Sequence, residues 1–294
     1  MTQTSFLGDK PIGRIGFGAM QLAGPGVFGP PRDPDAARAV LRRAIELGVD
    51  HIDTSQYYGP DVVNDLIRET LHPYPENLKL VTKVGARRDD RGAWLPALSP
   101  AELRQGVEDN LRALRVERMD LVNLRVADAQ GGLGEPTEEQ VVTMKELQQE
   151  GKLDLIGISN VTLDGLRRAA ELTELGEVQN AYSVMDRTND PLVEFCVERD
   201  IAFVPFFPLG SAFGGGPAKL AADPAVASVA AKHGATPSQV ALAWLLARSD
   251  RILLIPGTTT VAHLEENMAA GDVALDADDL TALESVEQTG RPIR

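Results

Sequence analysis

Residues 49–84 read VDHIDTSQYYGPDVVNDLIRETLHPYPENLKLVTKV, the most informative part of the chain for fold class. Short apolar runs at 49–55 and 78–84 flank a longer amphipathic stretch. Two strands joined through a helix in this way form a βαβ unit of a parallel sheet. Most of the short apolar runs along the chain are apolar on consecutive positions rather than strictly alternating, which is typical of strands covered on both faces.

The same alternation of short apolar and longer amphipathic segments continues along the whole chain. Helix start signals lie between the apolar runs. Asp33-Pro34 precedes the amphipathic residues 35–48, and three capping boxes pair Ser99 with Glu102, Thr137 with Gln140 and Thr236 with Gln239. The eight predicted strands are residues 14–22, 49–55, 78–84, 119–126, 155–160, 177–182, 201–208 and 251–257.

Eight strands separated by helices, with no linker between them, predict one closed barrel. The expected fold is α/β, a single (β/α)8 TIM barrel spanning residues 1–294, a length ordinary for such a barrel. An open, doubly wound sheet is the alternative. That fold would carry an early G-x-G-x-x-G fingerprint, and Gly13, Gly16 and Gly18 are spaced wrongly for it.

Composition and charge argue against several classes of function. The net charge of −14 disfavours nucleic acid and anionic membranes as partners. The first residues predict no signal peptide, and no apolar run is long enough to span a bilayer. The lone Cys196 cannot form an internal disulfide, and His51, His72, His233 and His263 lack metal-ligand spacing. We therefore expect a soluble, cytoplasmic protein that binds no metal.

In a barrel of this type, chemistry takes place where the strands end. Lys83 lies near the end of an apolar strand, where an unpaired charge is costly, and Asp53 ends the neighbouring strand. A tyrosine beside this pair would feel the ammonium, which lowers the pKa of a phenol toward that of a general acid. Together the three groups would donate a proton to a carbonyl oxygen as hydride reaches its carbon. The alternative is a structural ion pair beside an ordinary loop tyrosine.

Residues 53–59, DTSQYYG, and 82–85, TKVG, resemble signatures of the aldo-keto reductase family. The resemblance extends from residues 6–20, an N-terminal β-hairpin in the family, to the I-P-G…E-N segment near the C-terminus. It implies that Asp53 holds Lys83, that Lys83 tunes Tyr58, and that Tyr58 is the acid. Tyr58 is chosen over Tyr57 because it directly precedes Gly59.

The resemblance also implies a site for NADPH. Ser159, Asn160 and Gln179 match the family's contacts to the nicotinamide carboxamide, and Phe206 its aromatic ring against the nicotinamide. For the implied cofactor residues near the C-terminus, at positions 256–267, the alternative role is helix capping and turn formation. NADH is left open, because only His263 remains as a cation beside the expected 2′-phosphate. The other implied cofactor residues are Pro208, Leu209, Gly210 and Ser211 in the seventh loop, and Pro256, Gly257, Thr258, Thr260, His263, Glu266 and Asn267 in the eighth.

Arg125 departs from the family pattern, in which a histidine ends the fourth strand. An arginine is always charged and can anchor an oxygen, but it cannot shuttle a proton. The alternative is a salt bridge, to Asp128 or another carboxylate, that points away from substrate. The variant resembles a bacterial subgroup that includes pyridoxal reductases, which implies reduction of pyridoxal to pyridoxine. Four residues on catalytic-end loops are candidates for the substrate pocket: Met20, Phe28, Trp94 and Phe207.

Two other functions stay open at this point. One is a broad-specificity reductase of small aldehydes, and the other is a slow-turnover NADP(H)-binding sensor or regulatory protein. The expected partner is in each case a small molecule, a carbonyl compound for the enzyme. The acidic surface is compatible with a monomer or a weak homo-oligomer.

Overall fold

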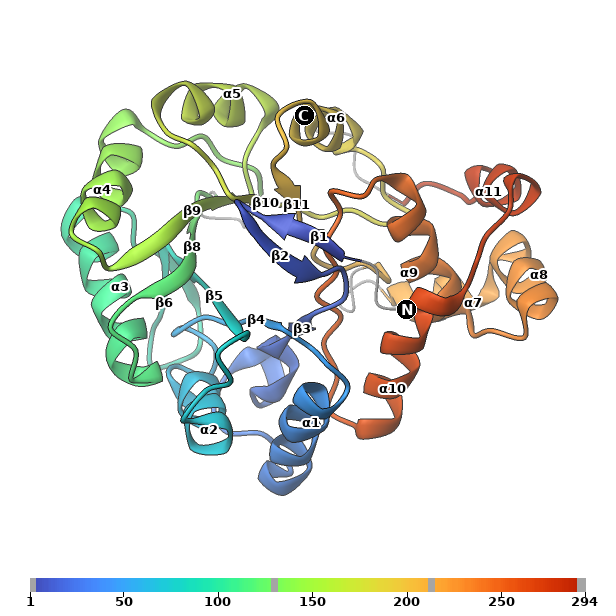
Figure 1. The fold of residues 1–294 in the computed structure, drawn as a ribbon, viewed down its shortest axis with the longest axis horizontal. Helices are drawn as coiled ribbons and strands as arrows, with labels where there is room; N and C mark the ends of the chain where they lie inside the picture. Colours follow the sequence, from blue (N-terminus) through green and yellow to red (C-terminus); the bar gives the residue numbers. More distant parts are fainter. Residues whose placement is uncertain (1–3, 128–131, 211–214, 290–294) are drawn as a thin grey trace.

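The computed structural model describes residues 4–127, 132–210 and 215–289. Seven parallel strands form one sheet in the order β11-β10-β9-β8-β5-β4-β3, curled around a central axis (Figure 1). Residues far apart in sequence therefore meet at the rims of this sheet. The strands are β3 Phe17–Gly18, β4 His51–Asp53, β5 Lys79–Val84, β8 Met119–Arg125, β9 Leu153–Ser159, β10 Glu177–Gln179 and β11 Ala202–Phe203.

Residues 251–255 close the sheet into a barrel. They pair with both edge strands through isolated bridges, Ile15 with Leu254 and Phe203 with Ile252. The backbone N–H of Gly16 donates to the carbonyl of Leu254 over 2.8 Å, which joins the first and last strand positions. The predicted (β/α)8 barrel is thus confirmed, although its eighth strand pairs through single bridges rather than a continuous ladder.

Most strands are shorter than the apolar runs that predict them, although β9 (Leu153–Ser159) begins before its predicted run. The run at 201–208 forms a strand only over Ala202–Phe203, and Phe207 further along has a φ of 56°. A left-handed residue cannot continue an extended strand. The run at 14–22 likewise leaves the sheet after Gly18 and becomes a short 3-10 helix, η1 (Ala19–Leu22). These departures at the carboxyl ends build the loops of one rim.

Helices surround the barrel where the sequence predicts them (Figure 1). All three predicted capping boxes are present, and the Asp33 side chain caps the first helix. The helices are α1 Pro34–Glu46, α2 Val62–Leu71, α3 Pro100–Leu114, α4 Glu138–Gln149, α5 Leu163–Leu172, α6 Asp190–Glu198, α7 Gly216–Ala222, α8 Pro224–His233, α9 Pro237–Arg248, α10 Val261–Ala269 and α11 Ala277–Glu284, with short 3-10 turns η2 Pro25–Val27 and η4 Ala270–Asp272.

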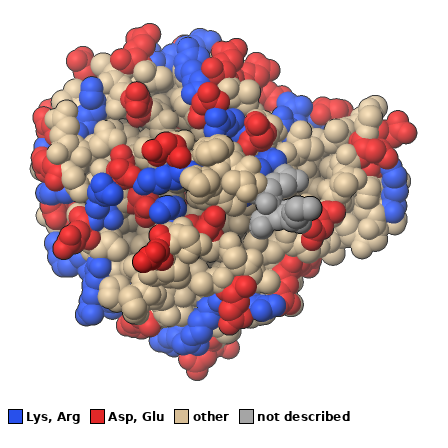
Figure 2. Space-filling view, viewed as in Figure 1, with Lys and Arg blue, Asp and Glu red and all other residues tan. Residues whose placement is uncertain are grey.

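An antiparallel hairpin of β1 (Thr4–Leu7) and β2 (Lys10–Gly13) lies across the barrel opening (Figure 1). Lys10 pairs with Asp154 at the start of β9, so the hairpin covers the amino ends of the strands. Its Leu7 and Ile12 are buried against apolar residues of the barrel interior, including Val81. Acidic and basic side chains are interspersed over this face (Figure 2). The hairpin closes the amino end of the barrel, which leaves the carboxyl end open to a substrate.

A second hairpin, which the sequence analysis missed, follows β5 at the opposite end. It pairs β6 (Ala86–Arg88) with β7 (Trp94–Pro96). The Arg88 guanidinium stacks over the Trp94 ring at 4.1 Å and donates to the carbonyls of Val27 and Gly26 over 2.8 and 3.0 Å. These bonds attach the hairpin to the loop after β3. Within the described residues, no helix is both long and apolar enough to cross a membrane.

Arg14 holds the closing strand in place from inside the protein. Its side chain is 6% exposed, and it donates to the backbone carbonyls of Leu246 (2.8 Å), Ile252 (3.2 Å) and Ser249. Burial lowers the pKa of this guanidinium, an effect that the nearby Asp250 opposes. One side chain thus ties the end of α9 and the strand after it to the start of the chain.

We expect Arg14→Met to lower the free energy of unfolding by about 2–4 kcal/mol, because it leaves several buried carbonyls without a donor. Urea unfolding monitored by circular dichroism measures the change. The matched control is Arg42→Met on the exposed face of α1, which should cost less than about 0.5 kcal/mol. Equal losses in the two variants would show that Arg14 does not hold the barrel closed.

Candidate active site

A cavity of about 700 Å³ opens at the carboxyl ends of the strands. Because the strands are parallel, their last residues meet at one rim of the barrel. Asp53, Lys83, Arg125, Ser159 and Gln179, which lie at or near the ends of five different strands, all line this cavity. The candidates predicted from separate segments of the sequence are therefore brought together in one place.

Lys83 and Asp53 form a buried ion pair at the base of the cavity. The two residues are 6% and 3% exposed, and the Lys83 ammonium also donates to the carbonyl of Thr54 over 3.2 Å. The second oxygen of Asp53 accepts from Gln179 Nε2 over 2.8 Å. Residues of three strands, β4, β5 and β10, thus contribute to the pair and its hydrogen bonds, which a buried ion pair needs to be stable.

Tyr58 lies beside this pair, in the loop between β4 and α2. Its ring centroid is 5.3 Å from the Lys83 ammonium nitrogen, and the side chain is 5% exposed. Gly59 follows with a φ of 91°, and a Cβ there would lie 2.6 Å from the Cβ of Val62. The glycine therefore permits the sharp turn that keeps Tyr58 facing the cavity.

From the sequence, the Lys83 ammonium is expected to lower the pKa of Tyr58, and this expectation is wrong. Burial raises the pKa of Tyr58 well above its ordinary value, the charge of Asp53 raises it further, and Arg125 opposes them. Loss of water around a phenol disfavours its charged form, and Asp53 cancels much of the field of Lys83. The phenol is accordingly held in its protonated form.

Arg125 ends β8 and lines the cavity, with its guanidinium carbon 5.7 Å from the centroid of Trp94. No carboxylate in residues 4–127, 132–210 and 215–289 forms an ion pair with it, and Asp128 lies outside the described residues. Trp94 also meets the edge of Tyr57 at 5.4 Å. Its aromatic ring thus lies among two arginines and a tyrosine at the cavity wall.

Most of the predicted cofactor residues line the cavity as well. Gln179 Oε1 is buried and has no hydrogen-bond partner among the described residues. Asn160 has a φ of 59°, unusual for a residue other than glycine, and Ser159 Oγ donates to its side chain over 3.1 Å. The predicted residues found at the cavity are Ser159, Asn160, Gln179, Phe206, Pro208, Leu209, Gly210, Pro256 and Gly257.

The remaining candidates lie elsewhere or make other contacts. Thr258, Thr260, His263, Glu266 and Asn267 are not among the residues that line the cavity. Thr260 caps α10 through the N–H of His263, the Thr258 hydroxyl accepts from Thr260, and Glu266 accepts from Thr236. The capping interpretation of this segment is therefore satisfied, and its role toward the cofactor stays a prediction.

Met20, Trp94 and Phe207 line the cavity. Phe28 is not among the lining residues, and its ring centroid lies 5.4 Å from the guanidinium carbon of Arg88. Phe28 thus remains only a predicted pocket residue. Ser211 lies outside the described residues.

Two polar residues inside the barrel were missed by the sequence analysis. Asn123 of β8 and Glu177 of β10 are buried and hydrogen-bonded to each other over 2.6 Å. The signal was present, because Glu177 is a charged residue in the predicted strand 177–182, as Lys83 is in the predicted strand 78–84. The same argument that selected Lys83 would have selected Glu177.

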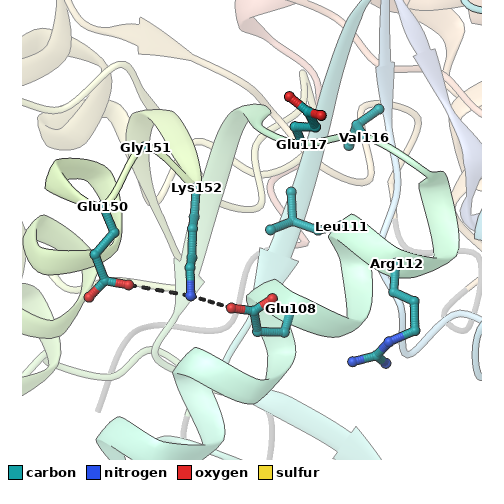
Figure 3. Close-up of a pocket in the computed structure, with 8 residues that line it drawn as sticks. All are labelled: Glu108, Leu111, Arg112, Val116, Glu117, Glu150, Gly151 and Lys152. Atoms are coloured by element: carbon teal, nitrogen blue, oxygen red, sulfur yellow. Dashed lines mark hydrogen bonds and ion pairs between the residues drawn. The ribbon is translucent and has the colours of Figure 1, made fainter.

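A second, shallow pocket lies at the opposite end of the barrel (Figure 3). Glu117 and Lys152 in its lining precede β8 and β9, so it lies at the amino ends of these strands. Lys152 points between Glu108 and Glu150 and pairs with both carboxylates. Its charge is thus balanced by these carboxylates, and the described residues that line this pocket are different from those that line the cavity at the other rim. Among the described residues, no cluster of His, Cys, Asp or Glu could hold a metal ion.

Comparison with known proteins agrees with this geometry. The model of the aldo/keto reductase family matches residues 14–288. The chain is 50% identical over 289 residues to pyridoxine 4-dehydrogenase of Escherichia coli strain K12, covering 98% of this chain and 99% of that protein. It is also 35% identical over 278 residues to an uncharacterized oxidoreductase of Schizosaccharomyces pombe, covering 95% and 88% of the two chains.

Among solved structures, a thermostable aldo-keto reductase crystallised with the inhibitor epalrestat matches with a TM-score of 0.79 and 26% identity. The match covers 96% of this chain and 98% of that one. The family resemblance of the active-site segments is thus supported by the whole chain and by the fold. The chain belongs to the aldo/keto reductase family and is an oxidoreductase.

Proposed function

We propose that the protein is an NADPH-dependent reductase that converts pyridoxal to pyridoxine. The observation that carries the proposal is the position of Tyr58, whose ring centroid lies 5.3 Å from the Lys83 nitrogen of the Lys83–Asp53 pair, in a cavity also lined by Arg125. The 50% identity to a pyridoxine 4-dehydrogenase supports the choice of substrate. The chain would act in the cytoplasm as a single barrel domain, and its acidic composition is compatible with a monomer or a weak homo-oligomer.

The lining of the cavity fits a nicotinamide cofactor. The unpaired Gln179 Oε1 suits the N–H groups of a carboxamide, with Ser159 and Asn160 beside it. Phe206 supplies an aromatic face in the same lining. When bound there, NADPH supplies a hydride to the carbonyl carbon of the substrate. The protein's own contribution is to orient the reactants and to deliver a proton.

Tyr58 would deliver that proton to the carbonyl oxygen. Because its pKa is raised, the phenol remains protonated over the whole neutral range, and an oxygen that gains alkoxide character is a much stronger base. Arg125 opposes the rise of the Tyr58 pKa, so its charge stabilises the phenolate left behind. The products are the alcohol and the oxidised cofactor, which balances the hydride and the proton.

Arg125 would also select the substrate. Pyridoxal is a flat aromatic aldehyde with a phenolate, which a guanidinium can bind through charge-assisted hydrogen bonds. Trp94 and Phe207 provide apolar surface in the same lining. A cationic group beside an aromatic wall fits this substrate better than a small aliphatic aldehyde.

Tyr58→Phe removes only the proton donor. We expect kcat for pyridoxal reduction to fall by about 100-fold or more, since general acids contribute about 10²–10⁴-fold, while the Kd for NADPH stays within about twofold. Steady-state kinetics and fluorescence titration measure the two quantities. Tyr57→Phe is the matched control, because the Tyr57 hydroxyl has no hydrogen-bond partner among the described residues. A fall confined to Tyr57→Phe would mean that the adjacent tyrosine is the acid.

Arg125→Gln should change substrate choice. We expect kcat/KM for pyridoxal to fall about tenfold or more relative to kcat/KM for a neutral aryl aldehyde, the loss of one hydrogen bond to a charged group. The exposed Arg87→Gln should leave this ratio unchanged.

A panel of pyridoxal, an aryl aldehyde, methylglyoxal and a simple ketone, with NADPH and NADH, tests the function itself. Selectivity for pyridoxal with NADPH is the expected result. Equal rates on all carbonyl compounds would show that the protein is a general reductase. Tight binding of NADPH without turnover would show that it is a sensor.

A further inference from the structure

A second carboxylate lies inside the barrel, and the reaction proposed above does not use it. Glu177 begins β10 and is 2% exposed. The pairing register places it in one row with Gly157 of β9, Asn123 of β8 and Lys83 of β5. Residues paired in register on neighbouring parallel strands direct their side chains to the same face of the sheet. Glu177 and Lys83 therefore both project into the interior of the barrel.

Hydrogen bonds connect Glu177 to the Lys83–Asp53 pair. Its Oε1 accepts from Asn123 Nδ2 and from Gln179 Nε2, each over 2.6 Å. The same Gln179 nitrogen donates to Asp53 Oδ2 over 2.8 Å. Gly157 leaves space for this arrangement, because a Cβ at that position would lie 2.2 Å from Asn123 Oδ1. Asn123 thus reaches across β9 to Glu177.

This arrangement fixes the amide of Gln179. Both hydrogens of its Nε2 are used, one by each carboxylate, and hydrogen bonds to ionised acceptors are about twice as strong as neutral ones. The orientation of the amide plane is thereby set, and Oε1 is left as an acceptor on a residue of the cavity lining. Asp53 alone would leave one Nε2 hydrogen unused and the amide freer to rotate.

Glu177 also changes its charge in the neutral pH range. Burial raises its pKa to about 7, and the charge of Asp53 adds to the rise. The hydrogen bonds from Asn123 and Gln179 and the charge of Lys83 oppose it. The charged groups that face Glu177 are Asp53 of β4 and Lys83 of β5, while β8, β9 and β11 contribute the uncharged Asn123, Gly157 and Ala202.

We propose that Glu177 is a positioning residue of the nicotinamide site, which holds the amide of Gln179 and sets the preference for oxidised over reduced cofactor through its own charge. The inference rests on the proposed function. With Glu177 ionised, the cluster of Glu177, Asp53 and Lys83 carries a net charge of −1, and with Glu177 protonated it is neutral. The nicotinamide ring is positively charged in NADP⁺ and neutral in NADPH. The ionised form therefore favours NADP⁺.

The test is the ratio of two dissociation constants, Kd for NADP⁺ over Kd for NADPH, from about pH 5.5 to about pH 8.5 by protein fluorescence, spanning the pKa of Glu177. Both cofactors carry the same 2′-phosphate, so its titration cancels in the ratio. We expect the ratio to fall by about threefold or more as pH rises through 7 in the wild type. Glu177→Gln keeps the shape of the side chain but does not titrate, so its ratio should stay constant. The exposed Glu174→Gln, in the loop before β10, should behave as wild type.

A second measurement needs no cofactor. Because the folded pKa of Glu177 lies above the unfolded value of about 4.3, the unfolded chain releases this proton first. The wild type should therefore lose stability relative to Glu177→Gln as pH rises from about 4.3 to about 7, and the gap should stay constant above that range. Urea midpoints of both proteins follow this difference.

The outcomes separate the two proposals. Wild-type protein that binds neither cofactor at any pH overturns the proposed function and this inference with it. Binding with the same pH-dependent ratio in wild type and Glu177→Gln overturns the role of Glu177 alone. A stability gap that does not change with pH would also overturn it, because the carboxyl would then not titrate in the expected range.

Discussion

An ammonium group inside a barrel constrains everything around it. The Lys83 side chain is 6% exposed, and its amino group pairs with Asp53 and donates to the carbonyl of Thr54. Unpaired, a buried charge costs several kcal/mol. Asp53 in turn depends on Gln179 from the other side of the barrel. The strands β4, β5 and β10 must therefore hold a fixed register before the site exists, and the fold and the candidate site are specified by the same contacts.

The two ends of the barrel have different structural roles. The β1–β2 hairpin covers the amino end with Leu7 and Ile12, so that end is packed with apolar side chains. At the carboxyl end, the β6–β7 hairpin is attached by Arg88 to backbone carbonyls of a neighbouring loop. The wall that carries Trp94 is thus built into the folded structure, and it places an aromatic ring against Arg125.

Much of this could be predicted from the sequence, for reasons that are visible in individual residues. Apolar runs mark the strands, and the capping boxes at Ser99, Thr137 and Thr236 mark helix starts, because both signals are local. Lys83 and Asp53 were identified because a charge in an apolar strand needs a partner.

What could not be predicted depends on distant parts of the chain. The direction of the Tyr58 pKa shift follows from how deeply the folded barrel buries that phenol. The single-bridge closure at Leu254 joins segments that only the closed barrel brings together. The bond between Asn123 and Glu177 depends on the order β8-β9-β10 in the sheet, which places both residues beside Gly157.

Replacing glycine by alanine is a common way to stabilise a protein, because it reduces the freedom of the unfolded chain. At Gly157 that strategy would fail for a reason that no backbone angle reveals. Because Gly157 of β9 has no side chain, the side chain of Asn123 can pass over it from β8 to Glu177 of β10. Position 157 can therefore take a side chain only if Asn123 is changed with it. A redesign of the interior of this barrel has to treat these two positions together, whereas Glu177 can be exchanged for a residue of the same shape.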